Sequence, residues 1–146
     1  MIGAGTVMSE DEVRKVAAAG GRLVVMPHSD PAIIKAAKAM DLLPVPGVAT
    51  PSEAFAALRA GADALKLFPA ETLPPAAVKA WRAVLPAETR LLPVGGIVPE
   101  AMAPYVAAGA SGFGLGSALY RAGDGPDLVA NNADRFVTAW NALALT

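Results

Sequence analysis

Short apolar runs alternate along the chain with longer, alanine-rich amphipathic segments. Glycine or proline follows most of the short runs, as expected of buried parallel strands bounded by turns. Many of the amphipathic segments end at an Ala-Gly step or at paired glycines, which are typical helix stops. The predicted strands are residues 2–7, 23–26, 43–45, 64–68, 91–94 and 113–115. The pattern therefore predicts six consecutive units of strand followed by helix.

Three of the predicted helices begin at a recognisable cap. Ser9 with Glu12, and Thr50 with Glu53, have the spacing of a capping box, in which side chains and backbone N–H groups bond reciprocally. Asp30 is followed by a proline, which is favoured at the first helical position. The capping box gives Glu53 a structural role. Further helices are expected at 75–85, from 99 to about 108 and from about 127.

Repeated strand–helix units predict an α/β protein with a parallel sheet. Right-handed crossovers of this kind build either a doubly wound open sheet or a closed barrel, and the pattern alone leaves both open. In both, functional residues gather at the carboxyl ends of the strands. The unusual residues of this chain fall there: Thr6, Pro27, His28, Gly47, Phe68, Gly95, Gly96, Gly116 and Ser117.

Composition narrows the possible functions. The chain has 146 residues, 54% of them hydrophobic and 17% charged, which favours one domain over residues 1–146 with a substantial core. Its formal net charge is -1, and without a basic run we expect no nucleic-acid partner. With no cysteine and one histidine, we expect no metal and no cofactor. The sequence shows no signal peptide and no apolar run of membrane-spanning length, so we expect no membrane partner and a cytoplasmic location.

Lys66 stands in the middle of an apolar run bounded by Gly61 and Pro69. Alternate residues of a strand share a face, so Lys66 should point with Ala64 and Phe68. Burial disfavours the charged ammonium, and a neutral lysine amine can form a Schiff base with a ketone. The alternative is a lysine that reaches solvent or pairs with a carboxylate, and the strand pattern leaves both interpretations open.

Two glycine-rich turns follow the last two predicted strands. They contain Gly95 with Gly96, and Gly116 with Ser117. Glycines let a phosphate approach backbone N–H groups, and the hydroxyl of Ser117 adds a donor. In eight-stranded barrels the phosphate site commonly follows the two final strands. The alternative is that these glycines only shape tight turns.

Other polar and aromatic residues are less informative. Thr6 could bind a substrate carboxylate or simply end a strand, and His28 could be a base or a solvated loop residue. Glu71 is the carboxylate closest in sequence to the Lys66 strand, as a proton-transfer group or a solvent-facing side chain. Trp81 and Trp140 lie at helical spacing among apolar residues, which favours packing over ligand binding.

Five ordered segments resemble signatures of the 2-keto-3-deoxy-6-phosphogluconate and 2-keto-3-deoxy-6-phosphogalactonate aldolases. They are residues 3–7, 46–54, 64–70, 93–97 and 114–120. The segment 119–123 is more similar to the phosphogalactonate branch. The resemblance implies a (β/α)8 TIM barrel, usually a trimer, that acts without a metal as a class I aldolase. Its substrate would be a phosphorylated 2-keto-3-deoxy sugar acid, cleaved to pyruvate and glyceraldehyde 3-phosphate.

The resemblance also implies site residues. Lys66 matches the Schiff-base lysine, Thr6 the position that contacts the pyruvate carboxylate, and Pro27 a residue of the same pocket. Phe68 stands beside the lysine. The phosphate-binding turns match Gly95, Gly96, Gly116 and Ser117.

The chain departs from the family pattern at its start. The family has about two further strand–helix units before the segment 3–7, and these carry a general-base glutamate and a substrate-binding arginine. Loss of a general base lowers a rate by about two to four orders of magnitude. We therefore expect a truncated barrel of about six units, impaired in turnover and with unpaired edges on the first and last strands. The alternatives are a non-catalytic phosphate-binding or oligomerisation module derived from the barrel, and another phosphate-binding barrel enzyme such as an isomerase.

Overall fold

Short parallel strands alternate with helices in the computed structural model, which describes residues 1–143 of the chain. The strands are β1 (Gly3–Ala4), β2 (Leu23–Val25), β3 (Leu43–Val45), β4 (Gly47–Val48), β5 (Leu65–Leu67) and β6 (Leu91–Pro93). The α-helices are α1 (Glu10–Ala18), α2 (Pro31–Ala39), α3 (Pro51–Ala60), α4 (Pro75–Arg82), α5 (Met102–Ala107) and α6 (Pro126–Leu143). Two 3₁₀ helices, η1 (Ala70–Thr72) and η2 (Pro99–Ala101), precede α4 and α5. This alternation confirms the predicted α/β class. The single domain predicted over 1–146 includes residues 144–146, which lie outside the described residues.

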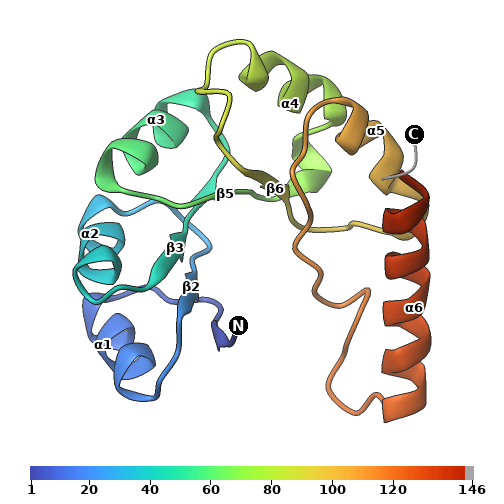
Figure 1. Cartoon of the computed structure of the whole chain (residues 1–146), viewed down its shortest axis with the longest axis horizontal. Helices are drawn as coiled ribbons and strands as arrows, with labels where there is room; N and C mark the ends of the chain where they lie inside the picture. Colours follow the sequence, from blue (N-terminus) through green and yellow to red (C-terminus); the bar gives the residue numbers. More distant parts are fainter. Residues whose placement is uncertain (144–146) are drawn as a thin grey trace.

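The strands form two parallel sheets, ordered β1-β2-β3 and β4-β5-β6. Pro46 separates β3 from β4, and this segment bonds to a neighbour on each side. The Val45 carbonyl accepts from the backbone N–H of Met26 at 3.0 Å, and the Pro46 carbonyl accepts from that of Lys66 at 2.9 Å. The two sheets therefore continue into each other. Figure 1 shows the strands on the inner side of an arc, with α1 to α4 on its outer side.

Of the strands predicted at the two ends of the chain, the first is shorter than the sequence indicated and the last does not form. The first, expected over 2–7, is reduced to β1. The prediction of a strand at 113–115 was wrong, because only an isolated parallel bridge between Val94 and Gly114 forms there. Glycine has a low strand propensity, and Gly114 approaches Val94 so closely that a Cβ would meet its side chain. The segment still lies alongside β6, since the N–H of Gly114 donates to the Pro93 carbonyl at 3.0 Å.

The helix starts confirm the predicted caps at Asp30 and Thr50. A carboxylate oxygen of Asp30 accepts from the backbone N–H two residues later at 2.8 Å. Thr50 and Glu53 form the complete capping box, with Thr50 Oγ1 accepting from the N–H of Glu53 at 3.3 Å and the Glu53 carboxylate accepting from the N–H of Thr50 at 2.9 Å. Glu53 is therefore a structural residue, as predicted. Hydrogen bonds to its carboxylate, from the backbone N–H of Ala49 first and then from Thr50, lower the pKa of its carboxyl.

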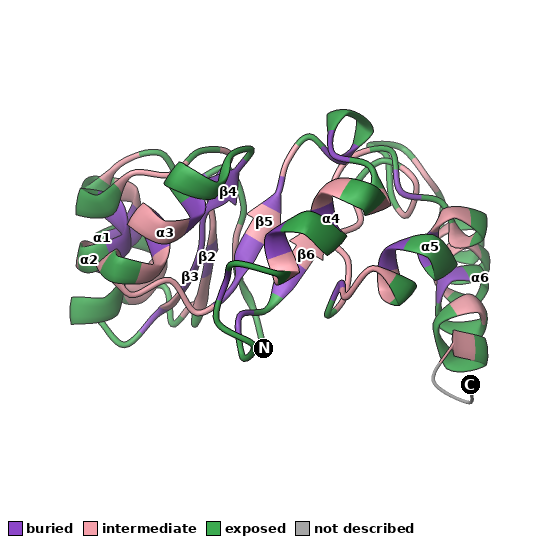
Figure 2. Ribbon diagram, turned by 90° about the horizontal axis from the view of Figure 1, so that it is seen from above, coloured by how far each residue is buried: buried purple, intermediate pink, exposed green. Residues whose placement is uncertain are grey.

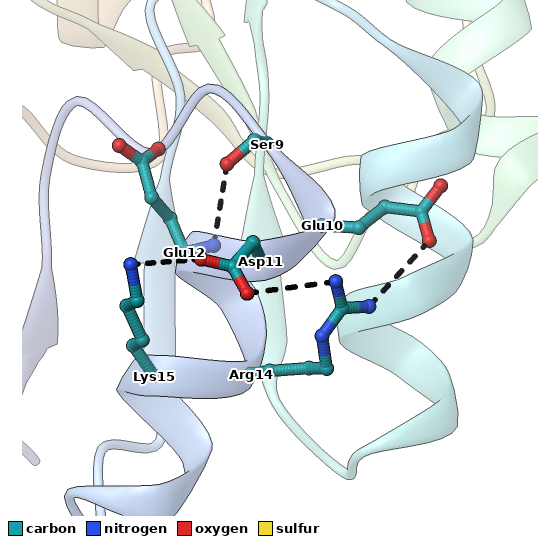
Figure 3. Close-up of polar contacts among 6 residues, drawn as sticks. All are labelled: Ser9, Glu10, Asp11, Glu12, Arg14 and Lys15. Atoms are coloured by element: carbon teal, nitrogen blue, oxygen red, sulfur yellow. Dashed lines mark hydrogen bonds and ion pairs between the residues drawn. The ribbon is translucent and has the colours of Figure 1, made fainter.

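The first helix differs from its predicted capping box in one bond. Ser9 Oγ accepts from the N–H of Glu12 at 3.2 Å (Figure 3). The Glu12 carboxylate accepts from the N–H of Met8, at 2.6 Å, in place of that of Ser9. The exposed side of α1 carries ion pairs such as Asp11 with Lys15 at 2.8 Å, which contribute little at a solvated surface.

The core lies between the sheets and the helices. Figure 2 shows the buried residues concentrated along the strands and on the helix faces toward them. Fully buried members include Val24, Leu65, Leu67 and Leu91 from strands and Val13, Ile34, Ala54 and Val78 from helices. Trp81 is buried in this core, which confirms its packing role, whereas Trp140 is 38% exposed and packs edge-on against Phe113, with ring centroids 6.2 Å apart. Within residues 1–143, no helix is long and apolar enough to cross a membrane.

Candidate active site

Lys66 occupies the middle position of β5, the central strand of its sheet. Its register partners are Gly47 on β4 and Leu92 on β6. Its sequence neighbours Leu65 and Leu67 are fully buried on the opposite face, as the period of a strand predicts. The lysine side chain is half-buried on the other face.

The Lys66 amine is held over an aromatic ring. Its Nζ lies 4.1 Å from the centroid of the Phe68 ring, which confirms that the two side chains share a face. Burial lowers the pKa of the Lys66 amine. Among residues 1–143, no carboxylate forms an ion pair with it. Burial raises the fraction of neutral, nucleophilic amine at a given pH, and the absence of an ion pair does not fit the alternative of a lysine paired with a carboxylate.

Pro27 is brought next to Lys66 through Gly47. Gly47 is buried, and a Cβ at this position would collide with the Pro27 carbonyl. The N–H of Gly47 also donates to the carbonyl of His28 at 3.3 Å. The end of β2 therefore packs directly on the strand position that lies beside Lys66, and only glycine permits this approach.

A cavity of about 450 Å³ lies beyond the carboxyl ends of β5 and β6. Among the residues predicted from the sequence, Phe68, Gly95, Gly96, Gly116 and Ser117 line it. Phe68 contacts the Lys66 amine and also borders this cavity. The structure thus brings both glycine-rich turns to one cavity, which Lys66 itself does not line; the lysine reaches its border through the contact with Phe68.

The two glycine turns differ in why they need glycine. Gly95 and Gly96 have φ angles of +109° and +62°, in the region that side chains disfavour. The Glu71 side chain packs against both, and a Cβ at Gly95 would collide with its carboxylate. Gly116 has open space where a Cβ would stand, with nothing within 4 Å, and no positive φ. The turn-shaping alternative therefore accounts for the first pair and not for Gly116.

Two charged residues of the cavity lining were not among the predicted site residues. Glu71, weighed as a proton-transfer group, packs its carboxylate against the Gly95–Gly96 turn. Arg121 was missed; its Nε donates to the Ser117 carbonyl at 3.1 Å, and it lines the same cavity. The available signal was a lone cation closely following a glycine-serine turn at the predicted phosphate end of the sheet.

Thr6 and His28 lie at the same edge of the sheet but do not line this cavity. Thr6 follows β1 and adopts a φ of +57°, which costs a threonine about 1–3 kcal/mol. Both side chains are exposed. The positions agree with the predicted carboxyl edge, whereas no hydrogen bond links Thr6 to Lys66 within the described part of the chain. In residues 1–143, no group of three or more His, Asp or Glu side chains could hold a metal ion.

Comparison with known proteins adds a family match. The model of the KDPG and KHG aldolase family matches residues 1–134, a range that includes all the site residues discussed above. The 2-dehydro-3-deoxy-6-phosphogalactonate aldolase of Escherichia coli (strain K12) is 44% identical over 140 residues, which cover 96% of this chain and 68% of the relative.

Solved structures agree with this match. A structure described as native KDPGal superposes with a TM-score of 0.97 at 42% identity, covering 99% of this chain and 70% of that one. A KDPG aldolase from Legionella pneumophila, with pyruvate captured at low pH as a covalent carbinolamine intermediate, gives a TM-score of 0.74 at 26% identity and covers 99% of this chain and 68% of that one. The similarity thus extends over nearly all of the present chain.

Proposed function

The chain belongs to the KDPG and KHG aldolase family, which consists of lyases, and on that premise we propose that it cleaves a phosphorylated 2-keto-3-deoxy sugar acid through a Schiff base on Lys66. The proposed substrate is 2-dehydro-3-deoxy-6-phosphogalactonate, with the phosphogluconate epimer as the second choice. The 44% identity to a phosphogalactonate aldolase supports this order. The observation that carries the proposal is the half-buried Lys66 amine, held over Phe68 at the border of the cavity.

The proposed reaction starts with attack of the neutral Lys66 amine on the C2 ketone. The resulting carbinolamine loses water and becomes a protonated imine. As the C4 hydroxyl gives up its proton to a base, the C3–C4 bond breaks and its electron pair moves into the imine, releasing glyceraldehyde 3-phosphate. The remaining enamine is protonated at C3 and hydrolysed to pyruvate, which restores the amine. The carbinolamine captured in the Legionella pneumophila relative supports the first step.

Phe68 has a specific role in this proposal. Its ring lies under the Lys66 nitrogen at 4.1 Å, and an aromatic face attracts a cation. The protonated imine keeps its positive charge where the neutral amine has none. Phe68 therefore favours the imine over the starting amine, while burial of the same nitrogen favours the neutral form before the ketone arrives.

The other predicted site residues would contact the two ends of the proposed substrate. Gly95, Gly96, Gly116 and Ser117 would hold the C6 phosphate, and their shared cavity supports this assignment. Thr6 and Pro27 would lie at the pyruvate end, in line with the packing of Pro27 against Gly47 beside the lysine. The bound substrate would then extend from C2 at Lys66, past Phe68, to the C6 phosphate in the cavity.

We further propose that the curved sheet with its outer helices has the arrangement of about six consecutive units of a (β/α)8 barrel, with residues 1–146 in one domain. The parallel pairing and the position of the helices outside the arc support this (Figure 1). The trimer expected from the resemblance remains a prediction, which sedimentation velocity of the purified chain tests directly.

The experiment that tests the function is a cleavage assay with both epimers. Released pyruvate is measured by coupled reduction, for the native chain, Lys66→Met and the control Lys79→Met, which changes an exposed lysine on α4. We expect pyruvate from the native chain and from the control, faster with the phosphogalactonate, and none from Lys66→Met. A folded chain that binds phosphate compounds but releases no pyruvate would instead support the non-catalytic module.

A further inference from the structure

We propose that Arg121 is a phosphate-binding residue of this site and that it makes the site select phosphorylated substrates. The inference rests on the proposed function, because it assigns a residue to the phosphate end of that substrate. Arg121 follows the second glycine turn and lines the cavity together with Gly95, Gly96 and Ser117.

The backbone of Arg121 is fixed by a short closed loop. Its N–H donates to a carboxylate oxygen of Asp124 at 2.7 Å, and the N–H of Asp124 donates back to the Arg121 carbonyl at 3.0 Å. The preceding residues turn tightly, since the N–H of Tyr120 donates to the Gly116 carbonyl at 3.0 Å. The arginine therefore starts from a defined position although its loop lies at the surface.

The side chain is exposed, and one hydrogen bond from its inner nitrogen orients it. Nε donates to the Ser117 carbonyl at 3.1 Å, so the guanidinium lies against the turn whose hydroxyl and N–H groups are the proposed phosphate donors. The four N–H groups on the two terminal nitrogens of Arg121 have no hydrogen-bond partner within residues 1–143. A guanidinium anchored in this way presents a planar pair of donors, which matches two oxygens of a phosphate.

The charge of the cavity also calls for a cation at this position. Glu71 and Arg121 are the charged side chains of its described lining. Without Arg121, a phosphate would enter a cavity that carries only the negative charge of the Glu71 carboxylate, and like charges repel. The guanidinium offsets that charge and supplies donors, so the cavity can accept an anion.

The proposal is tested by calorimetric titration with glycerol 3-phosphate as the probe. The variants are Arg121→Ala, Arg121→Lys and the control Arg90→Ala, which removes an exposed arginine next to the amino end of β6. Circular dichroism checks that each variant is folded. For Arg121→Ala we expect the Kd to rise roughly 10- to 100-fold, the effect of losing a hydrogen bond between charged groups. Arg121→Lys keeps the charge but loses the fork, so its Kd should lie between those of the native chain and Arg121→Ala.

A second readout separates this inference from the proposed function. Pyruvate carries no phosphate, so borohydride trapping of pyruvate on Lys66 should be equal in Arg121→Ala and in the native chain. Equal Kd values for the native chain and Arg121→Ala, or no binding of glycerol 3-phosphate to the native chain, would overturn the role of Arg121. Absence of a pyruvate adduct with intact, Arg121-dependent phosphate binding would overturn the proposed function and leave the role of Arg121 standing.

Discussion

Replacing Gly116 by alanine distinguishes a glycine that serves a ligand from one that serves the fold. A Cβ at Gly116 has nothing within 4 Å, and this residue has no positive φ. The folded state therefore gains no clash, and the loss of backbone freedom in the unfolded chain stabilises by about 0.4–1 kcal/mol. We expect the free energy of unfolding of Gly116→Ala to equal or slightly exceed that of the native chain.

The comparison variant is Gly95→Ala, in the other glycine turn. Gly95 has a φ of +109°, and an added Cβ would collide with the Glu71 carboxylate. The strained backbone alone costs about 1–3 kcal/mol, before any displacement of Glu71. Gly125→Ala is the matched control, because Gly125 also has open space at the Cβ position and no positive φ. Urea denaturation of the three variants and the native chain measures these differences.

For phosphate affinity we expect the opposite result: Gly116→Ala should weaken binding although it does not destabilise the fold. Gly116 lines the cavity, and we expect the added methyl group to stand where the phosphate approaches the backbone, so that one hydrogen bond to a charged group is lost. Such a bond contributes about 1.5–3 kcal/mol, which corresponds to a roughly 10- to 100-fold higher Kd for glycerol 3-phosphate. Gly116→Ala with native stability and native affinity would refute the phosphate contact. Gly116→Ala with a stability loss like that of Gly95→Ala would refute the account of the open space.

Three further predictions concern the lysine strand and its supports. Gly47→Ala should destabilise the fold by about 1–3 kcal/mol in urea denaturation and should slow pyruvate trapping. The added methyl group would push the Pro27 backbone away from the strand that neighbours Lys66. Equal trapping at native stability would contradict this. Tyr105→Phe should cost about 1–2 kcal/mol in the same assay, since the buried hydroxyl shares its one proton between the carbonyls of Ala70 and Leu73, at 3.1 Å each. An unchanged midpoint would show that this donor adds no stability. Because burial lowers the pKa of Lys66, its amine loses its proton at a lower pH than that of a free lysine. The rate of pyruvate trapping should therefore be half-maximal below about pH 10.4. A midpoint at or above that pH would contradict the desolvation argument.

The sequence predicted best where local signals and burial agree. The strands at 23–25 and 65–67 were found because each is a short apolar run with turn residues after it, and the helix starts at Asp30 and Thr50 because cap chemistry is local. The strand expected at 113–115 failed for a physical reason. Its apolar residues fit a strand, but its glycines add no side-chain packing to hold the ladder, and a single bridge remains.

In the candidate site, too, local sequence signals predicted some features and missed others. The strand period alone placed Lys66 on the face of Phe68, and the structure has the two in contact. The roles of Glu71 and Arg121 depend on contacts that no periodicity encodes. Glu71 reaches the Gly95–Gly96 turn from a distant part of the chain, and the orientation of Arg121 is set by a backbone carbonyl. Such residues become visible only once the loops are placed in space.

The most direct test of the central claim, that Lys66 is a Schiff-base nucleophile, is mass spectrometry after incubation of the chain with pyruvate and borohydride. Borohydride reduces an imine to a stable secondary amine, so the adduct can be located by peptide mapping. We predict one pyruvate adduct, on the peptide that contains Lys66, and its loss in Lys66→Met with Lys79→Met unchanged. A folded chain with no adduct, or with adducts spread over exposed lysines and equal in Lys66→Met, would contradict the account.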